Sequence, residues 1–414
     1  MKLVLFSPVI PFPLSEGGKI SQFAFIDYLC KKINITLVLT IRNEQDNVYI
    51  KQLKTLWPQV KFETIDINEP KVIDRNILNY FRRLFQALKS FFKKKQFSAV
   101  GIGSRKELTS IITPRILKEV SEIIDKNNPD LIQIEFIDLI DTVLFLPQKI
   151  KKIFIHHEIG YAVLNSELES KGVQDKYSLF EVNKLKAFEL SLLKQYSGVF
   201  VFSENDKTKL TDELVKNVFS SPFPVLDESI KLIDSDNLKI EKLLFIGPES
   251  HPPNKDAVDW YINELLPEIE KEFNFILHVV GKWSAETIEK YKDDKRIFFA
   301  GFVDDVNKYS LNSILLVPVR IGSGIRTKIL YAMANGTPII SASIGCEGII
   351  GKNNHDFIVA NTPSEFRSAI GKLVYNPIFM YEMVKNAQEV IQNYYSQKAG
   401  GELRLKYYQQ VLNE

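Results

Sequence analysis

The chain has 414 residues, 45% of them hydrophobic and 25% charged, which is typical of a globular protein with two domains. Its 53 basic and 51 acidic residues give a formal net charge of +2, which excludes the basic excess of most nucleic-acid binders, so no nucleic acid is expected as a partner. The two cysteines, Cys30 and Cys346, form no CxxC pair, which argues against a disulfide framework and against a zinc site.

The first residues, MKLVLFSPVIPFPLSEGG, are typical of a strand followed by prolines rather than of the apolar region of a signal peptide. No stretch of about 18 or more apolar residues occurs, so no membrane-spanning helix is predicted. We therefore expect a cytoplasmic protein.

Short runs of β-branched and aromatic residues alternate with longer amphipathic segments, the pattern of parallel sheets covered by helices. Two series of such runs predict an α/β protein with two doubly wound domains. Strands of the first series are expected at 2–6, 35–40, 131–136, 151–157 and 198–203. Strands of the second series are expected at 242–247, 275–281, 297–302, 313–318, 337–343 and 356–360.

The segment 220–241 contains prolines and polar residues without a clear period, and we place the linker between the domains there. The predicted units are 1–225, 226–385 and a helical segment, 386–414, that returns to the first domain. Ligands of open α/β sheets bind outside the carboxyl ends of the strands, so we expect the site in the cleft between the domains.

Two loops of the first domain carry candidate site residues. Gly17 and Gly18 precede a helical stretch, where the backbone can approach a ligand and the helix start offers N–H groups; a simple turn is the alternative. His156 and His157 end a strand, and adjacent residues of an extended chain point to opposite faces, so no metal site is predicted. A histidine there can bind a ligand in the cleft or only satisfy the backbone.

The loop after the strand 242–247 is a further candidate. Gly247 ends the strand, and Asn254 is the expected cap of the next helix. Lys255 then falls in the first helical turn, where a cation opposes the helix dipole. An anionic ligand explains this lysine, and a solvated side chain is the alternative.

The segment GSGIRTKILYAMANG, at 322–336, combines a glycine turn with a short helix that ends at Gly336. The N–H groups at the helix start, together with Arg326 and Lys328, predict a compact site for a diphosphate; two solvated basic residues are the alternative.

The helical periodicity of this segment also makes a prediction about Tyr331. Ile325, Ile329 and Met333 form one apolar stripe, and Thr327 and Tyr331 lie nearly opposite it. Tyr331 is therefore predicted to lie outside the core, where its phenol can bind a ligand hydroxyl or be an exposed structural group.

An amphipathic stretch, ILNYFRRLFQALKSFFKKK at 77–95, joins an apolar stripe to a basic face. No acidic residue occurs between Asp74 and Glu107. This predicts peripheral contact with an anionic membrane, and a helix that packs on the first sheet is the alternative.

These segments converge on a known family. FIGPESHPPNKDAVDWYINELLPEI, HVVGKW, FAGFVDDVNKY and VPVRIGSGIRTKILYAMANGTPIISASIGCEGI resemble, in order and spacing, the nucleotide-binding half of family 4 glycosyltransferases of the bacterial polysaccharide type. The SEGG loop, the HHE strand end and KAFELSLLKQYSGVFVFSENDKTKL are similar to the acceptor-side half. The resemblance implies the GT-B fold, in which two Rossmann-like domains face a central cleft. It also implies retaining transfer from a nucleoside diphosphate sugar, without a metal or other cofactor.

The resemblance assigns roles to individual residues. Ser323 and Tyr331 occupy the two glutamate positions of the family's E-x7-E pattern, of which the second usually binds the ribose hydroxyls, so the ribose contact departs from the family. The resemblance implies that Gly17 and Gly18 approach the phosphates, Lys282 lies near the donor, and the base is held at Phe302 and Val303. The implied donor-binding residues are Gly17, Gly18, Gly247, Lys255, Lys282, Phe302, Val303, Ser323, Gly324, Thr327 and Tyr331. The implied catalytic residues are His157, Arg326 and Lys328.

The sequence thus predicts an enzyme that moves a sugar from a nucleoside diphosphate sugar to a glycan or a lipid-linked saccharide, at the inner face of the plasma membrane. Arg326 and Lys328 can stabilise the charge that develops on the leaving phosphate, while His157 orients the sugar. Two alternatives stay open. One is a nucleotide-sugar epimerase of the same fold, and the other is a catalytically impaired binding partner, for which the missing glutamates are the evidence.

Overall fold

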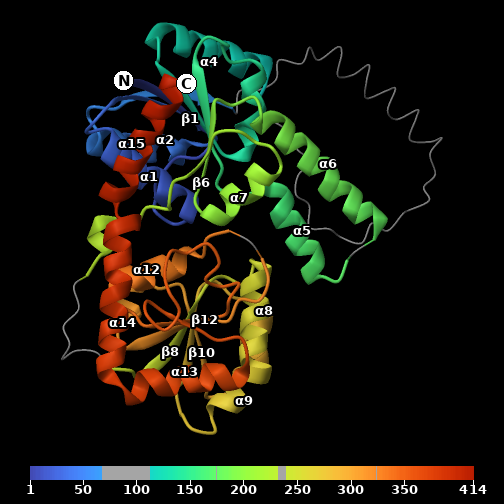
Figure 1. The fold of residues 1–414 in the computed structure, drawn as a ribbon, viewed down its shortest axis with the longest axis vertical. Helices are drawn as coiled ribbons and strands as arrows, with labels where there is room; N and C mark the ends of the chain where they lie inside the picture. Colours follow the sequence, from blue (N-terminus) through green and yellow to red (C-terminus); the bar gives the residue numbers. More distant parts are fainter. Residues whose placement is uncertain (68–111, 174, 232–238, 323) are drawn as a thin grey trace.

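A computed structural model describes residues 1–67, 112–173, 175–231, 239–322 and 324–414. The amphipathic stretch 77–95 and Ser323 lie outside the described residues. The chain forms two α/β domains, each built on a parallel sheet, as predicted (Figure 1).

The first domain contains a seven-stranded parallel sheet in the order β3-β2-β1-β4-β5-β6-β7. Each of the five predicted runs overlaps a strand, and the sheet adds β3 and β7 at its two edges. The strands are β1 (Lys2–Ser7), β2 (Asn34–Ile41), β3 (Lys61–Asp66), β4 (Leu131–Glu135), β5 (Lys151–Ile155), β6 (Gly198–Val201) and β7 (Val218–Ser220).

The second domain contains a six-stranded parallel sheet in the order β10-β9-β8-β11-β12-β13. Each strand falls within one of the six predicted runs. The strands are β8 (Lys242–Ile246), β9 (Leu277–Val280), β10 (Ile297–Gly301), β11 (Ser313–Val317), β12 (Ile339–Ser341) and β13 (Ile358–Val359).

Helices cover both faces of the first sheet. On β1, Leu3 and Leu5 belong to one buried core, and Val4 and Phe6 to the core on the other face. This two-sided burial explains the continuous apolar runs in the sequence. The first-domain helices are α1 (Gly17–Leu29), α2 (Glu44–Leu56), α4 (Pro114–Asn127), α5 (Gly160–Ser170), α6 (Lys176–Leu193) and α7 (Glu204–Asp212).

The second sheet is surrounded in the same manner, and the chain ends in long helices. The described α-helices are α8 (Pro252–Trp260), α9 (Leu266–Ile269), α10 (Ala285–Lys290), α11 (Val306–Tyr309), α12 (Thr327–Asn335), α13 (Pro363–Tyr375), α14 (Pro377–Val390) and α15 (Gln397–Asn413). The last of these, α15, leaves the second domain and packs against α1 of the first domain, as the red helix in Figure 1 shows.

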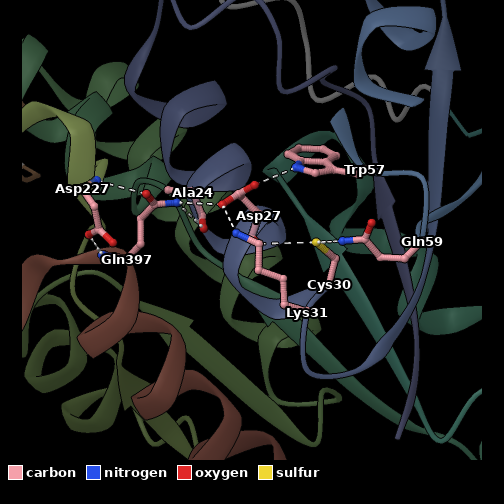
Figure 2. A network of polar contacts seen from close by, with 8 residues as sticks. All are labelled: Ala24, Asp27, Cys30, Lys31, Trp57, Gln59, Asp227 and Gln397. Carbon is pink, nitrogen blue, oxygen red and sulfur yellow. Dashed lines mark hydrogen bonds and ion pairs between the residues drawn. The ribbon is translucent and has the colours of Figure 1, made fainter. Parts of the chain in front are cut away.

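Two segments cross between the domains side by side: the linker after β7 and the start of α15. The backbone N–H of Val225 donates to the carbonyl of Tyr395 at 2.6 Å. Asp227 and Gln397 exchange two hydrogen bonds, at 3.0 and 3.1 Å. The Gln397 amide also donates to the carbonyl of Ala24 on α1 at 3.3 Å, so both crossings are tied to the first domain (Figure 2).

Asp27 of α1 extends this network within the first domain. Its carboxylate accepts hydrogen bonds from the indole of Trp57 at 3.0 Å and from the ammonium of Lys31 at 2.9 Å (Figure 2). Gln59 also donates to the thiol of Cys30 at 3.0 Å. The face of α1 that receives α15 is therefore fixed by polar contacts as well as by packing.

Candidate functional site

The loop between β11 and α12 has the geometry of a tight turn before a helix. Gly322 and Gly324 adopt φ values of 100° and 82°, a left-handed region that favours glycine. Helix α12 begins at Thr327, two residues later than predicted, with Arg326 as the residue before it. It ends at Gly336, whose φ of 77° is the left-handed conformation expected of a helix terminus.

Arg326 holds this loop from within. Its side chain is buried, and its guanidinium donates to the carbonyls of Gly324 at 2.5 Å and of Ile321 at 3.4 Å. Burial lowers the pKa of Arg326, and nearby acidic residues, among them Glu158 and Glu347, oppose this shift. Arg326 therefore shapes the turn and also supplies positive charge beneath it.

Lys328 lies on the first turn of α12, beside Arg326. Its ammonium donates to Oδ1 of Asn254 at 2.9 Å and lies 4.4 Å from the centre of the Phe245 ring. Burial and the Arg326 guanidinium lower the pKa of Lys328 to about 7. Burial and the same two cations lower the pKa of His251. A bound anion would restore the charged form of Lys328, so this cluster is suited to a phosphate.

The start of α1 meets the start of α12 across the cleft. A Cβ placed on Gly17 would lie 3.6 Å from Cγ2 of Thr327. A Cβ placed on Gly18 would lie 3.0 Å from the Phe136 ring and 3.7 Å from Nδ1 of His157. The structure thus brings the two glycine loops, predicted separately from the two halves of the sequence, to one place, with His157 beside them.

His157 follows β5 at the carboxyl end of the first sheet. Its ring stacks on Phe136, with centroids 4.0 Å apart, and meets the edge of Phe202 at 5.3 Å. Its Nε2 lies 3.2 Å from Oε2 of Glu135, at the end of β4. Nε2 therefore contacts a carboxylate. The other ring nitrogen, Nδ1, faces the loop of Gly18.

Glu135 is a site residue that the sequence analysis missed. It is 2% exposed, at the end of an otherwise largely apolar strand. One sequence feature could have identified it: Gln133 and Glu135 are polar residues at alternate positions of LIQIE. Polar residues in a buried strand need hydrogen-bond partners.

The adjacent His156 has a different partner. Its Nε2 lies 2.6 Å from Glu189 of α6, and both side chains are buried. Glu189 also accepts hydrogen bonds from the N–H groups of Gly160 and Tyr161. Burial opposes ionisation of Glu189, but the His156 and backbone contacts outweigh it and lower its pKa. The two histidines therefore contact separate carboxylates, and among the described residues no group of three potential metal ligands forms.

Tyr331 packs against the core without being one of its buried members, so the prediction holds only in part. Its ring is half-buried against the core, and its hydroxyl is buried without a hydrogen-bond partner among the described residues. Burial raises its pKa. Helix α12 packs between its sheet and α14, so the helix is buried on more than one face. The single apolar stripe in the sequence did not indicate this second buried face.

Several other predicted residues surround the cleft less closely. Gly247 is required by packing, because a Cβ there would lie 2.5 Å from the Asn254 amide. Lys255 does not join the cationic cluster; it is exposed and pairs with Glu249 at 2.9 Å, which offsets its unfavourable place in the helix. Lys282, after β9, is exposed.

Phe302 and Val303 follow β10, at the carboxyl edge of the second sheet. The Phe302 ring is 86% exposed, and Val303 is half-buried against the core. An aromatic ring that is exposed at the end of a strand is available for stacking on a planar ligand.

Helix α5 of the first domain covers the glycine turn of the second. The hydroxyl of Ser166 accepts a hydrogen bond from the N–H of Gly322 at 2.9 Å. A small pocket beside this contact is lined by Glu158, Ser166, Glu167, His251 and Gly322, among others. The N–H group of Gly322 therefore already donates to the oxygen atom of Ser166. A phosphate bound in the turn, as predicted from the sequence, would need the same N–H group.

Comparison with known proteins finds a family similarity within the second domain. Residues 240–376 match the family described as glycosyl transferases group 1. A Klebsiella pneumoniae protein, described as an uncharacterized 44.6 kDa protein in the cps region, is 22% identical over 411 residues, covering 96% of this chain and 97% of its own length.

Solved structures share the whole fold at low sequence identity. Sucrose-phosphate synthase from Thermosynechococcus elongatus is 15% identical, with a TM-score of 0.64 over 100% of this chain and 99% of its own. A TarM variant from S. aureus, in complex with fondaparinux, alpha-GlcNAc-glycerol and UDP, is 14% identical, with a TM-score of 0.64 over 100% of both chains.

Among the described residues, no helix is long and apolar enough to cross a membrane. The two parallel sheets, the cleft between them and the match over the second domain agree with one another. The whole chain therefore shares the two-domain fold of these glycosyltransferases, and its second domain is similar to the group 1 family.

Proposed function

We propose that this enzyme transfers a sugar from a nucleoside diphosphate sugar to a saccharide or glycolipid acceptor, with retention and without a metal ion. The observation that carries the proposal is the meeting of Gly17 and Thr327, the first residues of α1 and α12, above Arg326 and Lys328. Two helix N-termini then lie beside a buried guanidinium and a partly buried ammonium, an arrangement suited to a diphosphate.

The cationic cluster supplies the catalytic electrostatics of this proposal. Breaking the bond between sugar and diphosphate places negative charge on the leaving phosphate, and fixed donors at a water-poor site stabilise that charge. Lys328 provides an ammonium on the first turn of α12, while Arg326 keeps the turn in place through the carbonyls of Gly324 and Ile321. In same-face attack the leaving phosphate itself accepts the proton of the acceptor hydroxyl.

The remaining candidates are arranged around this centre. His157 lies beside Gly18, on the side of the first domain, and is placed to bind the transferred sugar. Phe302 is exposed for stacking on the base. The TarM structure contains UDP, which makes UDP the first nucleotide to test. The Klebsiella pneumoniae relative from a cps region favours a polysaccharide acceptor. Peripheral membrane contact through 77–95 stays part of the proposal, outside the described residues.

The experiment measures nucleotide binding and sugar transfer with the full chain. Thermal shift with UDP, GDP and other nucleoside diphosphates identifies the nucleotide, because a ligand that binds only the folded state raises the melting temperature. Transfer is then followed with the matching radiolabelled sugar donor and a glycolipid extract. Anomeric NMR of the product tests retention, and activity in excess EDTA tests metal independence.

Lys328→Met is the informative variant, since it keeps the length of the side chain and removes the charge. Lys242→Met is its matched control: Lys242 also lies over an aromatic ring, 4.3 Å from the centre of Tyr309, but at the amino end of β8. We expect Lys328→Met to lower kcat/KM by on the order of 10²-fold, within the range for loss of one transition-state contact, and Lys242→Met to leave it unchanged. No thermal shift with any nucleoside diphosphate would favour the binding-partner alternative, and conversion of donor without acceptor would favour an epimerase.

A further inference from the structure

A buried polar chain connects the C-terminal helix to the cleft. The hydroxyl of Tyr408, on α15, donates to Oε1 of Gln133 on β4. The amide nitrogen of Gln133 donates to Oε1 of Glu135 at 2.5 Å, and Oε2 of Glu135 lies 3.2 Å from Nε2 of His157. Tyr408, Gln133 and Glu135 are at most 2% exposed, so water does not compete for these bonds.

The hydrogen bonds of this polar chain all run in one direction. A carboxylate only accepts hydrogen bonds, so Gln133 must present its NH₂ group to Glu135, and Nε2 of His157 must carry a hydrogen. The amide oxygen of Gln133 then faces Tyr408, whose hydroxyl donates to it. In the neutral imidazole, Nδ1 is left without a hydrogen and is an acceptor. This nitrogen faces Gly18.

The same helix supplies the positive charge opposite Glu135. Arg404, one turn before Tyr408 on α15, is 1% exposed, and Glu135 is among the groups that attract its guanidinium. Its Nε donates to the hydroxyl of Ser221 at 3.1 Å. A buried carboxylate requires a compensating charge, and α15 contributes the cation near Glu135. The same helix contributes the phenol that bonds Gln133, which in turn bonds Glu135.

We propose that Glu135, Gln133 and Tyr408 are positioning residues, which fix His157 with Nδ1 as the acceptor for a hydroxyl of the transferred sugar. The inference rests on the proposed function, because the sugar is the ligand that His157 meets. Helix α15 is then part of the working site, although Tyr408 acts only through two other side chains.

The first test is Glu135→Gln. The new amide still offers its oxygen to the NH₂ group of Gln133, so its own NH₂ group faces Nε2 of His157 and forces the hydrogen onto Nδ1. The protein has five histidines, and ¹⁵N NMR of histidine-labelled protein resolves the two tautomers. The His157 signal is assigned by its absence in the spectrum of His157→Gln.

We expect the hydrogen on Nε2 in the wild type and on Nδ1 in Glu135→Gln. We also expect kcat to fall by on the order of 10²-fold or more, as when an orienting carboxylate is replaced by an amide, with UDP affinity within about twofold. An unchanged tautomer, or an unchanged kcat, would overturn the proposal.

The second test leaves the charges in place, so that it does not depend on how Glu135→Gln folds. Tyr408→Phe keeps the buried ring and removes the hydroxyl that orients Gln133 and that also contacts the Arg404 side chain. Its matched control is Tyr407→Phe on the same helix. The centre of the Tyr407 ring lies 4.8 Å from that of Phe219, and Tyr407 is not part of the polar chain that reaches His157.

We expect Tyr408→Phe to lower kcat by about 3- to 10-fold, the worth of one hydrogen bond, and to mix the two tautomers of His157, while Tyr407→Phe changes neither. Equal losses in both variants, with one unmixed tautomer, would show that α15 acts through packing alone and would overturn the proposal. If the tautomers respond as expected but the wild type transfers no sugar, the positioning chain stands and the proposed function fails.

Discussion

Gly17 and Thr327 face each other across the cleft, with 3.6 Å between Cγ2 of Thr327 and the position of a Cβ on Gly17. They are the first residues of α1 and α12, so their contact brings two helix N-termini together from two domains. A ligand bound there touches both domains at once. Nucleotide binding should therefore depend on the side chain at position 17 as strongly as on the cations of the second domain.

The pair Gly17→Ala and Gly17→Glu tests this dependence. The Cβ of alanine lies at an ordinary van der Waals distance from Thr327, so we expect folding and UDP affinity close to those of the wild type. Glutamate adds a negative charge beside the proposed diphosphate site. We expect its UDP dissociation constant to rise at least tenfold, about 1.4 kcal/mol, in calorimetry. Equal affinity in both variants would place the diphosphate elsewhere.

The lowered pKa of Lys328 predicts two opposite responses to pH. Burial and Arg326 lower this pKa from 10.5 to about 7 in the folded chain, so between pH 7 and 10.5 the unfolded state binds more protons. The destabilisation from the buried charge is complete at pH 7 and below, and it is relieved as pH rises toward 10.5. In urea titrations, the unfolding free energy of the wild type relative to Lys328→Met should therefore rise with pH across this window.

The affinity for the nucleotide should change with pH in the opposite direction. A diphosphate binds the charged lysine, so above pH 7 binding requires uptake of a proton and UDP affinity falls as pH rises. Calorimetry at pH 8 in two buffers of different ionisation enthalpy should detect this uptake in the wild type and detect less in Lys328→Met. Equal proton uptake in the two proteins would separate Lys328 from the ligand.

The sequence predicted the sheets well because strands buried on both faces are continuous apolar runs, as in Gly198–Val201. It missed β3, whose sequence KFETID alternates polar and apolar residues at the sheet edge, and β7, which has only three residues. The glycine turns were visible because they carry a local signature. The burial of the Tyr331 hydroxyl could not be predicted, because periodicity within one helix does not show which elements cover its other face.

Glu135 was beyond the reach of local patterns for a different reason. It is 22 residues from His157 in sequence, and only the register of β4 against β5, which pairs Glu135 with Ile155, brings the two side chains together. Tyr408 is 275 residues from Gln133, and only the return of α15 to the first domain joins them. Sequence motifs indicated the groups that we propose to face the ligand, whereas the groups that support them depend on tertiary packing.

Tyr331→Phe separates the structural and binding roles of the buried phenol. The hydroxyl has no hydrogen-bond partner among the described residues, so its removal should raise the unfolding free energy by about 1 kcal/mol or more in urea titration. If the hydroxyl binds the ribose, UDP affinity should fall by about 3- to 10-fold in the same variant. A more stable protein with unchanged UDP affinity would assign Tyr331 to the core alone.

Ser166→Ala tests whether the contact between the domains competes with the donor. The Ser166 hydroxyl accepts the N–H of Gly322 at 2.9 Å, and a phosphate oxygen in the glycine turn needs the same donor. Because the variant frees that N–H without adding bulk, we expect UDP to bind about 2- to 10-fold more tightly, the worth of one neutral hydrogen bond. Ser191→Ala is the control, since its hydroxyl bonds only locally, to the carbonyl of Phe188 within α6. Weaker UDP binding in Ser166→Ala alone would mean that the contact between α5 and the turn belongs to the nucleotide-bound enzyme, and that closure of the domains assists the donor rather than excluding it.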